Sequence, residues 1–330
     1  MRVHPAADWL LLAADTVVAG VHADLALTGL DDLGWKAVAA SVSDIAAMGG
    51  EVGHALVTVA GPSATDLDLL YRGVAAASAE FGCPVVGGDL TNADSLVVTV
   101  AVTGYSTGPP VRRDGARPGD GVWVTGPLGA AAAGLRLLRR RAARGGTGAA
   151  GTGAAGTATG GTATAGTATA GAGSGGFGSG GFGSGAVLAH ARPVARLAEG
   201  RAARAAGATA MIDISDGLTA DLDHVASASG VGLRLHSIPI HPEATPEEAL
   251  GGGEDFELAF CAGDAQSVEA GFGGLSRPVL IGVCTEDPGE RTLDGRPFLP
   301  SGWEHSWGGS AAAGAALGGE PVARDVGGSR

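Results

Sequence analysis

Aromatic residues and cysteines are scarce in this chain of 330 residues. Aromatic side chains make up 4% of the sequence, so the 45% that is hydrophobic must build a core mainly from Ala, Val and Leu. The three cysteines, Cys83, Cys261 and Cys284, lack the close spacing of a metal site or a disulfide framework. Sparse cysteines of this kind are typical of a reducing compartment, and we therefore expect a cytoplasmic protein.

Basic residues are also few, since 21 Lys and Arg stand against 34 Asp and Glu and give a formal net charge of −13. This balance argues against a general basic surface, so we expect neither nucleic acid nor an anionic membrane as a partner. No apolar run reaches the length of a membrane-spanning helix, and residues 9–14 are too few for the apolar region of a signal peptide. An anionic substrate is still compatible with this charge, because a bound metal ion inverts the local field.

The length and the turn residues indicate two α/β domains. The turn-rich stretch 112–121 separates them, and we expect an N-terminal domain at 1–112 and a C-terminal domain at 113–307. Asp31 or Asp32 is expected to cap the first helix of the N-terminal domain. Apolar patterns there predict a β-α-β-α-β-β order, with strands at 10–21, 54–59, 84–86 and 95–105 and helices at 32–48 and 65–81.

The second half contains a segment of unusual composition. Residues 145–185 are mainly Gly, Ala, Thr and Ser in near-repeats, which cannot bury enough apolar surface to offset the entropy of ordering. We expect a disordered insertion there, within the C-terminal domain, and a disordered tail at 308–330. The remaining pattern predicts strands that begin near residues 122, 210, 232, 256 and 278 and helices that begin near residues 130, 218 and 247.

The phrase Met-Ile-Asp-Ile-Ser-Asp-Gly-Leu at 211–218 leads an apolar strand into two carboxylates and a hydroxyl. Side chains alternate along a strand, so Asp213 and Ser215 are expected to point to the same side. Asp216 is expected at the turn, where a carboxylate can cap the next helix. Two carboxylates this close repel unless a cation neutralises them, and Mg²⁺ is a natural partner for their oxygens. These residues alone leave turn chemistry and metal binding equally open.

Other acidic residues occur at unusual positions. Asp44 is expected near the C-terminal end of its helix, where the helix dipole disfavours an anion. Asp89 follows Gly87 and Gly88 at the predicted end of a strand, where glycines allow close approach to phosphate oxygens. An ordinary surface aspartate and a plain turn are the alternatives. The sequence has no Gly-x-x-x-x-Gly-Lys phosphate loop, so ATP would be bound through a carboxylate-held metal and glycine backbone.

Taken in order, eight phrases form one pattern. They are Asp-Thr-Val-Val-Ala-Gly-Val-His at 15–22, Trp-Lys-Ala at 35–37, Ser-Asp-Ile-Ala-Ala-Met-Gly at 43–49, Gly-Gly-Asp at 87–89, Pro-Gly-Asp at 118–120, Thr-Gly at 125–126, Asp-Ile-Ser-Asp-Gly-Leu at 213–218 and Gly-Gly-Glu-Asp-Phe-Glu-Leu at 252–258. Their order and spacing resemble the thiamine-monophosphate kinase family, in the superfamily that also holds aminoimidazole ribonucleotide synthetase, selenophosphate synthetase and the hydrogenase maturation dehydratase.

The resemblance implies a two-domain aminoimidazole ribonucleotide synthetase-like fold. Its N-terminal α/β domain would pair with that of a second copy into a dimeric β-barrel, and ATP would bind between the N- and C-terminal domains. The γ-phosphoryl group of ATP would pass directly to the phosphate of thiamine monophosphate, giving thiamine diphosphate. Several Mg²⁺ ions would bridge the phosphates, so that catalysis is mainly positioning and electrostatics.

The resemblance also implies roles for residues that match the family motifs. The implied metal ligands are Asp15, Asp44, Asp89, Asp213 and Asp216. The implied ATP contacts are Tyr71, Gly88, Asp89, Arg113 and Ser215. The implied substrate contacts are His22, Glu254 and Trp303. An indole at Trp303 suits stacking on a cationic thiazolium, although a tryptophan in ordinary packing would show the same sequence.

The chain departs from the family pattern near its start. The family carries a Gly-Asp-Asp-Ala-Ala phrase with a further metal-binding aspartate, and Met1 falls just after the place where that phrase ends. Ala13 and Ala14 replace the usual hydroxyl residues. We expect one metal position to lack ligands, either because the true start lies upstream or because this form is impaired. Two alternatives therefore stay open: another ATP-using superfamily member, such as an aminoimidazole ribonucleotide synthetase-like ligase, or a non-catalytic homologue that binds nucleotide or thiamine phosphate.

Overall fold

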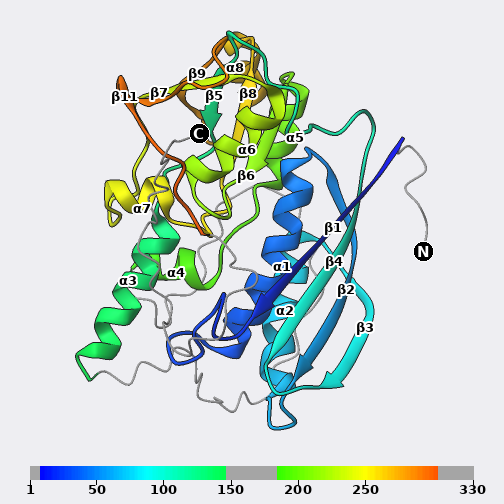
Figure 1. Cartoon of the computed structure of the whole chain (residues 1–330). Coiled ribbons are helices and arrows are strands. Elements are labelled where there is room, and N and C mark those ends of the chain that lie inside the picture. Colours follow the sequence, from blue (N-terminus) through cyan, green and yellow to red (C-terminus); the bar gives the residue numbers. More distant parts are fainter. Residues whose placement is uncertain (1–7, 146–183, 304–330) are drawn as a thin grey trace, which may run out of the picture.

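The computed structural model describes residues 8–145 and 184–303 (Figure 1). The predicted tail at 308–330 and nearly all of the predicted insertion at 145–185 lie outside the described residues. Residue 185 is an exception, because it begins a short helix that Ser184 caps by accepting a hydrogen bond from the Val187 N–H at 3.3 Å. Within the described ranges, no helix combines the length and the apolar character needed to cross a membrane.

The N-terminal part is a four-stranded sheet with two helices on one face (Figure 1). Its elements are β1 (Trp9–Val18), α1 (Leu30–Ala47), β2 (Glu51–Gly61), α2 (Leu67–Phe81), β3 (Val85–Asn92) and β4 (Val97–Ser106), with the strand order β1-β4-β2-β3. The inward residues of the strands are small and β-branched, such as Val57, Val98 and Val100, and they pack against α1 and α2. This sheet is open within one chain, with β1 and β3 as its edges.

The C-terminal part is built on a seven-stranded, mostly antiparallel sheet in the order β11-β10-β7-β9-β5-β8-β6. Its strands are β5 (Gly121–Val124), β6 (Ala210–Asp213), β7 (Gly232–Leu235), β8 (Leu258–Ala262), β9 (Val279–Thr285), β10 (Arg291–Leu293) and β11 (Arg296–Pro297). Its helices are α3 (Ala130–Ala143), α4 (Gly185–Ala191), α5 (Leu197–Ala205), α6 (Leu218–Ser229), α7 (Pro246–Gly251) and α8 (Ala265–Gly271). The mixed α/β architecture is therefore as predicted.

Helix α1 joins the two parts. It packs against β1, β4 and α2 on one side and against α5, α4 and β6 on the other (Figure 1). Close approach of α5 depends on Gly200, since a Cβ at this position would lie 2.1 Å from the carbonyl oxygen of Ala46. Because α1 is buried on nearly all sides, its polar residues need partners: Ser41 binds Val100 O in the N-terminal part, and Lys36 and Ser43 bind residues of the C-terminal part.

Several predicted boundaries were wrong for local reasons. Helix α1 begins after Gly29, and Asp31 and Asp32 lie in its first turn, where they bind Arg192 instead of capping the helix. Strand β3 runs on to Asn92, so the Gly-Gly-Asp phrase lies inside a strand and not after it. A Cβ at Gly88 would lie 1.8 Å from the carbonyl oxygen of Val57, so packing on β2 explains this glycine.

Candidate functional site

Three carboxylates that the sequence placed far apart meet where the two parts join. Asp15 extends from β1, Asp44 from the last turn of α1, and Asp213 from the end of β6. Burial raises the pKa of Asp44 to about 7, and the nearby charges of Asp213 and Asp15 add to this rise. Burial also raises the pKa of Asp213, with a further contribution from Asp15. The mutual effects show that these three side chains form one electrostatic cluster, which we call the junction cluster.

The junction cluster is poorly compensated. Ser43 Oγ donates a 2.6 Å hydrogen bond to Asp213 Oδ2, and the charge of Arg113 favours the ionised forms of Asp44 and Asp213. Asp15 Oδ2, in contrast, is buried with no hydrogen-bond partner among the described residues. A buried, unpartnered carboxylate oxygen is costly, so this atom indicates a place for a ligand.

These oxygens fit a divalent cation chemically. Hard cations such as Mg²⁺ prefer carboxylate ligands, and a cation would relieve the repulsion that raises the pKa values. In the described parts of the chain, however, no three His, Cys, Asp or Glu side chains are arranged as a metal site. The junction cluster therefore has the donor chemistry for a metal but not the geometry of a formed site.

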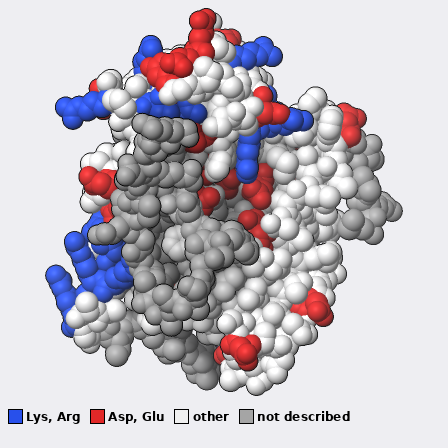
Figure 2. Space-filling view, viewed as in Figure 1, with Lys and Arg blue, Asp and Glu red and all other residues white. Residues whose placement is uncertain are grey.

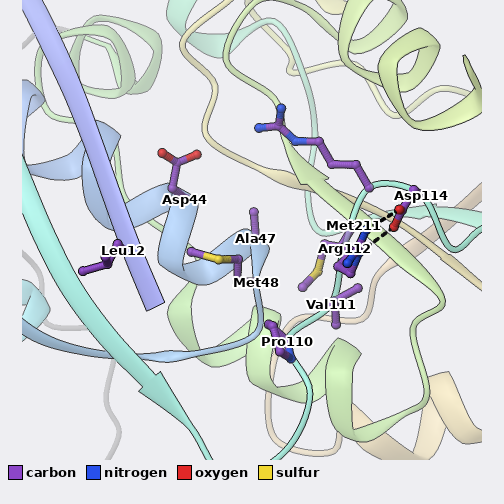
Figure 3. Close-up of a pocket in the computed structure, with 10 residues that line it drawn as sticks. Leu12, Asp44, Ala47, Met48, Pro110, Val111, Arg112, Asp114 and Met211 are labelled. Atoms are coloured by element: carbon purple, nitrogen blue, oxygen red, sulfur yellow. Dashed lines mark hydrogen bonds and ion pairs between the residues drawn. The ribbon is translucent and has the colours of Figure 1, made fainter. Parts of the chain in front are cut away.

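A pocket of about 500 Å³ lies beside the cluster. Asp44 on α1, Leu12 on β1 and Met211 on β6 border it, together with the segment 110–114 (Figure 3). Arg113 also lines this pocket, while the neighbouring Arg112 is bound to Asp114 at 2.8 Å. Figure 2 shows acidic side chains gathered in a hollow of the surface, with basic side chains above it. This arrangement can accept a metal-bound anion such as a phosphate chain.

The loop after β6 is shaped by a residue that the sequence analysis missed. Asp221 Oδ2 accepts hydrogen bonds from the N–H groups of Ser215, Asp216 and Gly217, at 3.0, 3.1 and 3.1 Å. Burial raises the pKa of Asp221 to about 7, with smaller effects of Asp216 and Asp213. The sequence did contain a signal for this role of Asp221, because a second aspartate occurs in the first helical turn after an Asp-Gly phrase.

Two predictions about this loop rested on premises that the structure does not support. Strand β6 ends at Asp213, so strand alternation does not determine the direction of Ser215. Helix α6 begins after Gly217, so Asp216 does not cap it. The loop does organise two of the predicted substrate residues, because Ser215 O accepts the Glu254 N–H at 2.8 Å and Asp216 O accepts the Trp303 N–H at 3.0 Å.

His22 lies in the turn after β1 and is half-buried. Its Nδ1 accepts a hydrogen bond from the Val18 N–H at 3.0 Å, so the neutral ring carries its proton on Nε2. This contact orients the ring within the turn. His22 lies beyond the end of the strand that carries Asp15.

Asp89 and Tyr71 are not brought to the junction cluster within one chain. The strand registers place Asp89 beside Thr58, Thr58 beside Thr99 and Thr99 beside Thr16. Paired residues share a face, so Asp89 lies on the outer face of the sheet, opposite to α1. Tyr71 is half-buried on α2, and burial raises its pKa.

Comparisons with known proteins identify the relatives of this chain. Residues 2–106 match the family model "AIR synthase related protein, N-terminal domain". The thiamine-monophosphate kinase of Bacillus subtilis (strain 168) is 33% identical over 261 residues, which are 75% of this chain and 70% of the relative. That of Corynebacterium glutamicum is 32% identical over 311 residues, which are 89% of this chain and 82% of the relative.

The chain belongs to the thiamine-monophosphate kinase family. The solved structure "AaThiL complexed with AMPPCP and TMP" superposes with a TM-score of 0.72 at 29% identity, covering 92% of this chain and 89% of the other. Membership of the thiamine-monophosphate kinase family agrees with the resemblance inferred from the motifs, and the mixed α/β fold agrees with what that resemblance implied.

Proposed function

We propose that the chain transfers the γ-phosphoryl group of ATP to thiamine monophosphate, giving thiamine diphosphate and ADP. The observation that carries the proposal is the junction cluster, a buried group of carboxylates with an unpartnered oxygen beside a pocket, in a member of this family. Relatives are named thiamine-monophosphate kinases, and a related structure was solved with AMPPCP and TMP. Both reactants are anions, which a chain with a net charge of −13 can accept only with local positive charge.

Mg²⁺ is the cation that we propose for the junction cluster, with Asp15, Asp44 and Asp213 as its protein ligands. When bound, it would neutralise phosphate oxygens and align the two phosphates for transfer. Ionisation of Asp44, whose pKa is about 7, would release a proton as the cation binds. Asp216 is proposed as a further ligand from the adjoining loop, since its charge acts on the same buried Asp221.

The remaining residues are proposed to bind and orient the reactants. Arg113 lines the pocket beside Asp44 and is proposed to hold ATP phosphate oxygens, with Ser215 on the facing loop. Glu254 and Trp303 are proposed to bind the cationic thiamine portion, through its charge and its ring face. His22, in the turn after β1, is proposed to contact the same substrate.

We also propose a homodimer, formed through the outer face of the N-terminal sheet. This face exposes large apolar side chains, among them Leu10 at 65%, Leu12 at 68% and Leu56 at 49%. An apolar face of this kind is typical of an interface, and a second sheet packed on it would complete a barrel. In a dimer, Gly88 and Asp89 would serve the site of the other copy, which would account for the separation of Asp89 from the junction cluster, whereas Tyr71 on α2 packs against the inner core.

Mixed dimers test this arrangement. Asp89→Asn and Asp213→Asn variants, each inactive alone, are unfolded together and refolded. If Asp89 acts in the site of the other copy, half of the dimers carry one intact site, and about a quarter of the wild-type activity returns. If no activity returns while each variant is dimeric, Asp89 acts within its own chain or not at all.

The cellular location that we propose is the cytoplasm. Cys83, Cys261 and Cys284 are all buried free thiols in the described structure, which suits a reducing compartment.

The proposed reaction is tested with the full chain, ATP, Mg²⁺ and thiamine monophosphate. Thiamine diphosphate is measured by oxidation to its fluorescent thiochrome and separation from the monophosphate. We expect product with the wild-type chain and none with Asp213→Asn. Absence of thiamine diphosphate while ATP is consumed with an aminoimidazole ribonucleotide precursor would favour the ligase alternative, and tight nucleotide binding without turnover would favour a non-catalytic homologue.

A further inference from the structure

Lys36 is the single lysine among the 21 basic residues of the chain. It lies on α1 and is 3% exposed, which is rare for a lysine unless a partner is present. Its Nζ is 2.8 Å from Glu254 Oε2, so the pair joins the N-terminal and C-terminal parts. The contact spans 218 residues of sequence and cannot result from local chain geometry.

One face of α1 makes two such contacts between the N-terminal and C-terminal parts. Lys36 and Ser43 are seven residues apart, which returns the helix to nearly the same direction after about 10 Å of rise. Ser43 binds Asp213 in the junction cluster, and Lys36 binds Glu254. One rigid helix face therefore sets the positions of a proposed metal ligand and a proposed substrate ligand relative to each other.

Glu254 is held from its backbone as well. Its N–H donates to Ser215 O at 2.8 Å, and its φ of 66° is unusual for a residue with a side chain. The preceding Gly253 has no room for a side chain, because a Cβ would lie 2.4 Å from Ser215 O. The backbone contacts thus fix the position of the Glu254 main chain, and Lys36 fixes the position of its carboxylate.

His190 completes the group at the same carboxylate oxygen. Its Nδ1 lies 3.6 Å from the same Glu254 Oε2, and burial lowers its pKa well below the usual value, helped by the charges of Lys36 and Arg139. His190 is therefore neutral, and Lys36 supplies the positive charge. The side chains of Lys36 and His190 are each 4% exposed while that of Glu254 is 28% exposed, so a ligand can reach only the carboxylate.

We propose that Lys36 is a positioning residue for the substrate, which holds the Glu254 carboxylate in place for the cationic portion of thiamine monophosphate. This inference rests on the proposed function. In the described structure, the contacts of Lys36 and His190 are both made with Oε2 of Glu254. Oε1 is therefore the atom assigned to the substrate. A lysine suits the position because its ammonium is a compact point charge, whereas the planar guanidinium of arginine needs more room.

Three substitutions test the role. Lys36→Met keeps the apolar stem and removes the charge, Lys36→Arg keeps the charge, and Glu254→Gln removes the partner. We expect Lys36→Met to raise KM for thiamine monophosphate about tenfold, which equals ~1.4 kcal/mol, with KM for ATP unchanged. Lys36→Arg should keep KM near the wild-type value while lowering Tm, because the larger group overpacks a buried site. Lys36→Met added to Glu254→Gln should raise KM no further than Glu254→Gln does alone.

Arg291→Met is the matched control. Arg291 Nε lies 2.8 Å from Asp223 Oδ1, and the two side chains are 12% and 33% exposed, close to the values of the Lys36 pair. This variant should lower Tm and leave both KM values unchanged. A KM for thiamine monophosphate that stays within about twofold of wild type in Lys36→Met would overturn the inference, as would equal increases in Lys36→Met and Lys36→Arg.

A spectroscopic measurement covers the case in which Lys36→Met does not fold. A wild-type chain labelled with isotopic lysine gives one lysine spin system, since the sequence has one lysine. Thiamine monophosphate should shift this signal, and a non-hydrolysable ATP analogue alone should not. No shift with saturating thiamine monophosphate overturns the inference while an active wild-type chain upholds the proposed function. A wild-type chain that forms no thiamine diphosphate overturns both.

Discussion

Two acidic regions lie next to each other where the N-terminal and C-terminal parts meet. They differ in how far the protein itself supplies their carboxylates with partners. In the junction cluster, burial and the charges of Asp213 and Asp15 raise the pKa of Asp44, burial and the charge of Asp15 raise that of Asp213, and Asp15 Oδ2 has no hydrogen-bond partner among the described residues. In the segment 254–257, every acidic side chain has a partner from another element. Glu254 binds Lys36, Asp255 caps α3, and Glu257 binds Arg196.

This difference distinguishes carboxylates that can bind a ligand from carboxylates that stabilise the fold. Asp255 Oδ1 accepts the Ala131 N–H at 3.0 Å, and Glu257 Oε1 lies 3.1 Å from Arg196 Nε, so these two carboxylates are satisfied by the protein itself. Among the junction carboxylates, Asp213 accepts a hydrogen bond from Ser43, whereas Asp15 Oδ2 has no such partner among the described residues and depends on a ligand for compensation. Substitutions in the two regions should therefore have opposite effects on stability, which the following predictions use.

The largest effect is expected in the satisfied region. Glu257→Ala should lower the free energy of unfolding by about 3 kcal/mol, because it leaves the partly buried Arg196 and the buried Thr125 hydroxyl without their acceptor. Urea denaturation followed by circular dichroism measures this. Glu290→Ala is the control, since its partner Arg234 is 59% exposed and the loss should be much smaller. Equal losses in both variants would refute the distinction.

The next effect should appear in activity without a loss of stability. Asp44→Asn should lower kcat/KM about a hundredfold, or ~2.7 kcal/mol, by removing a proposed metal ligand. The same change removes a carboxylate whose pKa is raised by burial and by like charges, so unfolding should need as much urea as before or more. Asp94→Asn, at an exposed loop position, should change neither quantity. A destabilised Asp44→Asn would show that the cluster is structural.

The pH dependence of stability is a third, smaller test. Asp44 has a pKa of about 7 in the folded chain against an ordinary 3.8, so the folded chain binds more protons between these values. The stability that this group contributes is complete below about pH 4 and is lost as the pH rises through 7. Relative to wild type, Asp44→Asn should gain on the order of 2 kcal/mol between pH 4 and pH 8 in metal-free buffer. A constant difference across that range would contradict the raised pKa.

The sequence predicted which aspartates come together at the junction better than it predicted the faces and lengths of the strands around them. Asp15, Asp44 and Asp213 were assigned to one site, and they do act on one another electrostatically. The face of Asp89 could not be read, because it depends on the irregular register of β2 at Ala55 and Leu56 and on the full length of β3. Neither feature has a local sequence signal, since a one-residue shift moves a side chain to the other face.

The fold shows the same limit. Long periodic elements such as α1, α2 and β4 were predicted within a few residues, because their buried faces repeat. The short elements β10, β11 and α8 were not predicted, since their three, two and seven residues carry too little periodicity. Lys36 appeared only as part of a motif, and its burial against Glu254 emerged from the packing of α1 on the C-terminal part.

The smallest effect is the response of stability to Mg²⁺. If the junction cluster binds this cation, a concentration ten times Kd should raise the free energy of unfolding by about 1.4 kcal/mol. Asp44→Asn should remove this gain, whereas Glu257→Gln, which alters only the satisfied region, should retain it. Potassium chloride at matched ionic strength controls for screening of the net negative charge, which acts on all variants alike. A gain that persists in Asp44→Asn would place the cation elsewhere. A gain lost in both variants would mean that cation binding depends on both acidic regions. It would then require the packing of the 254–257 segment as well as the charge of the junction cluster.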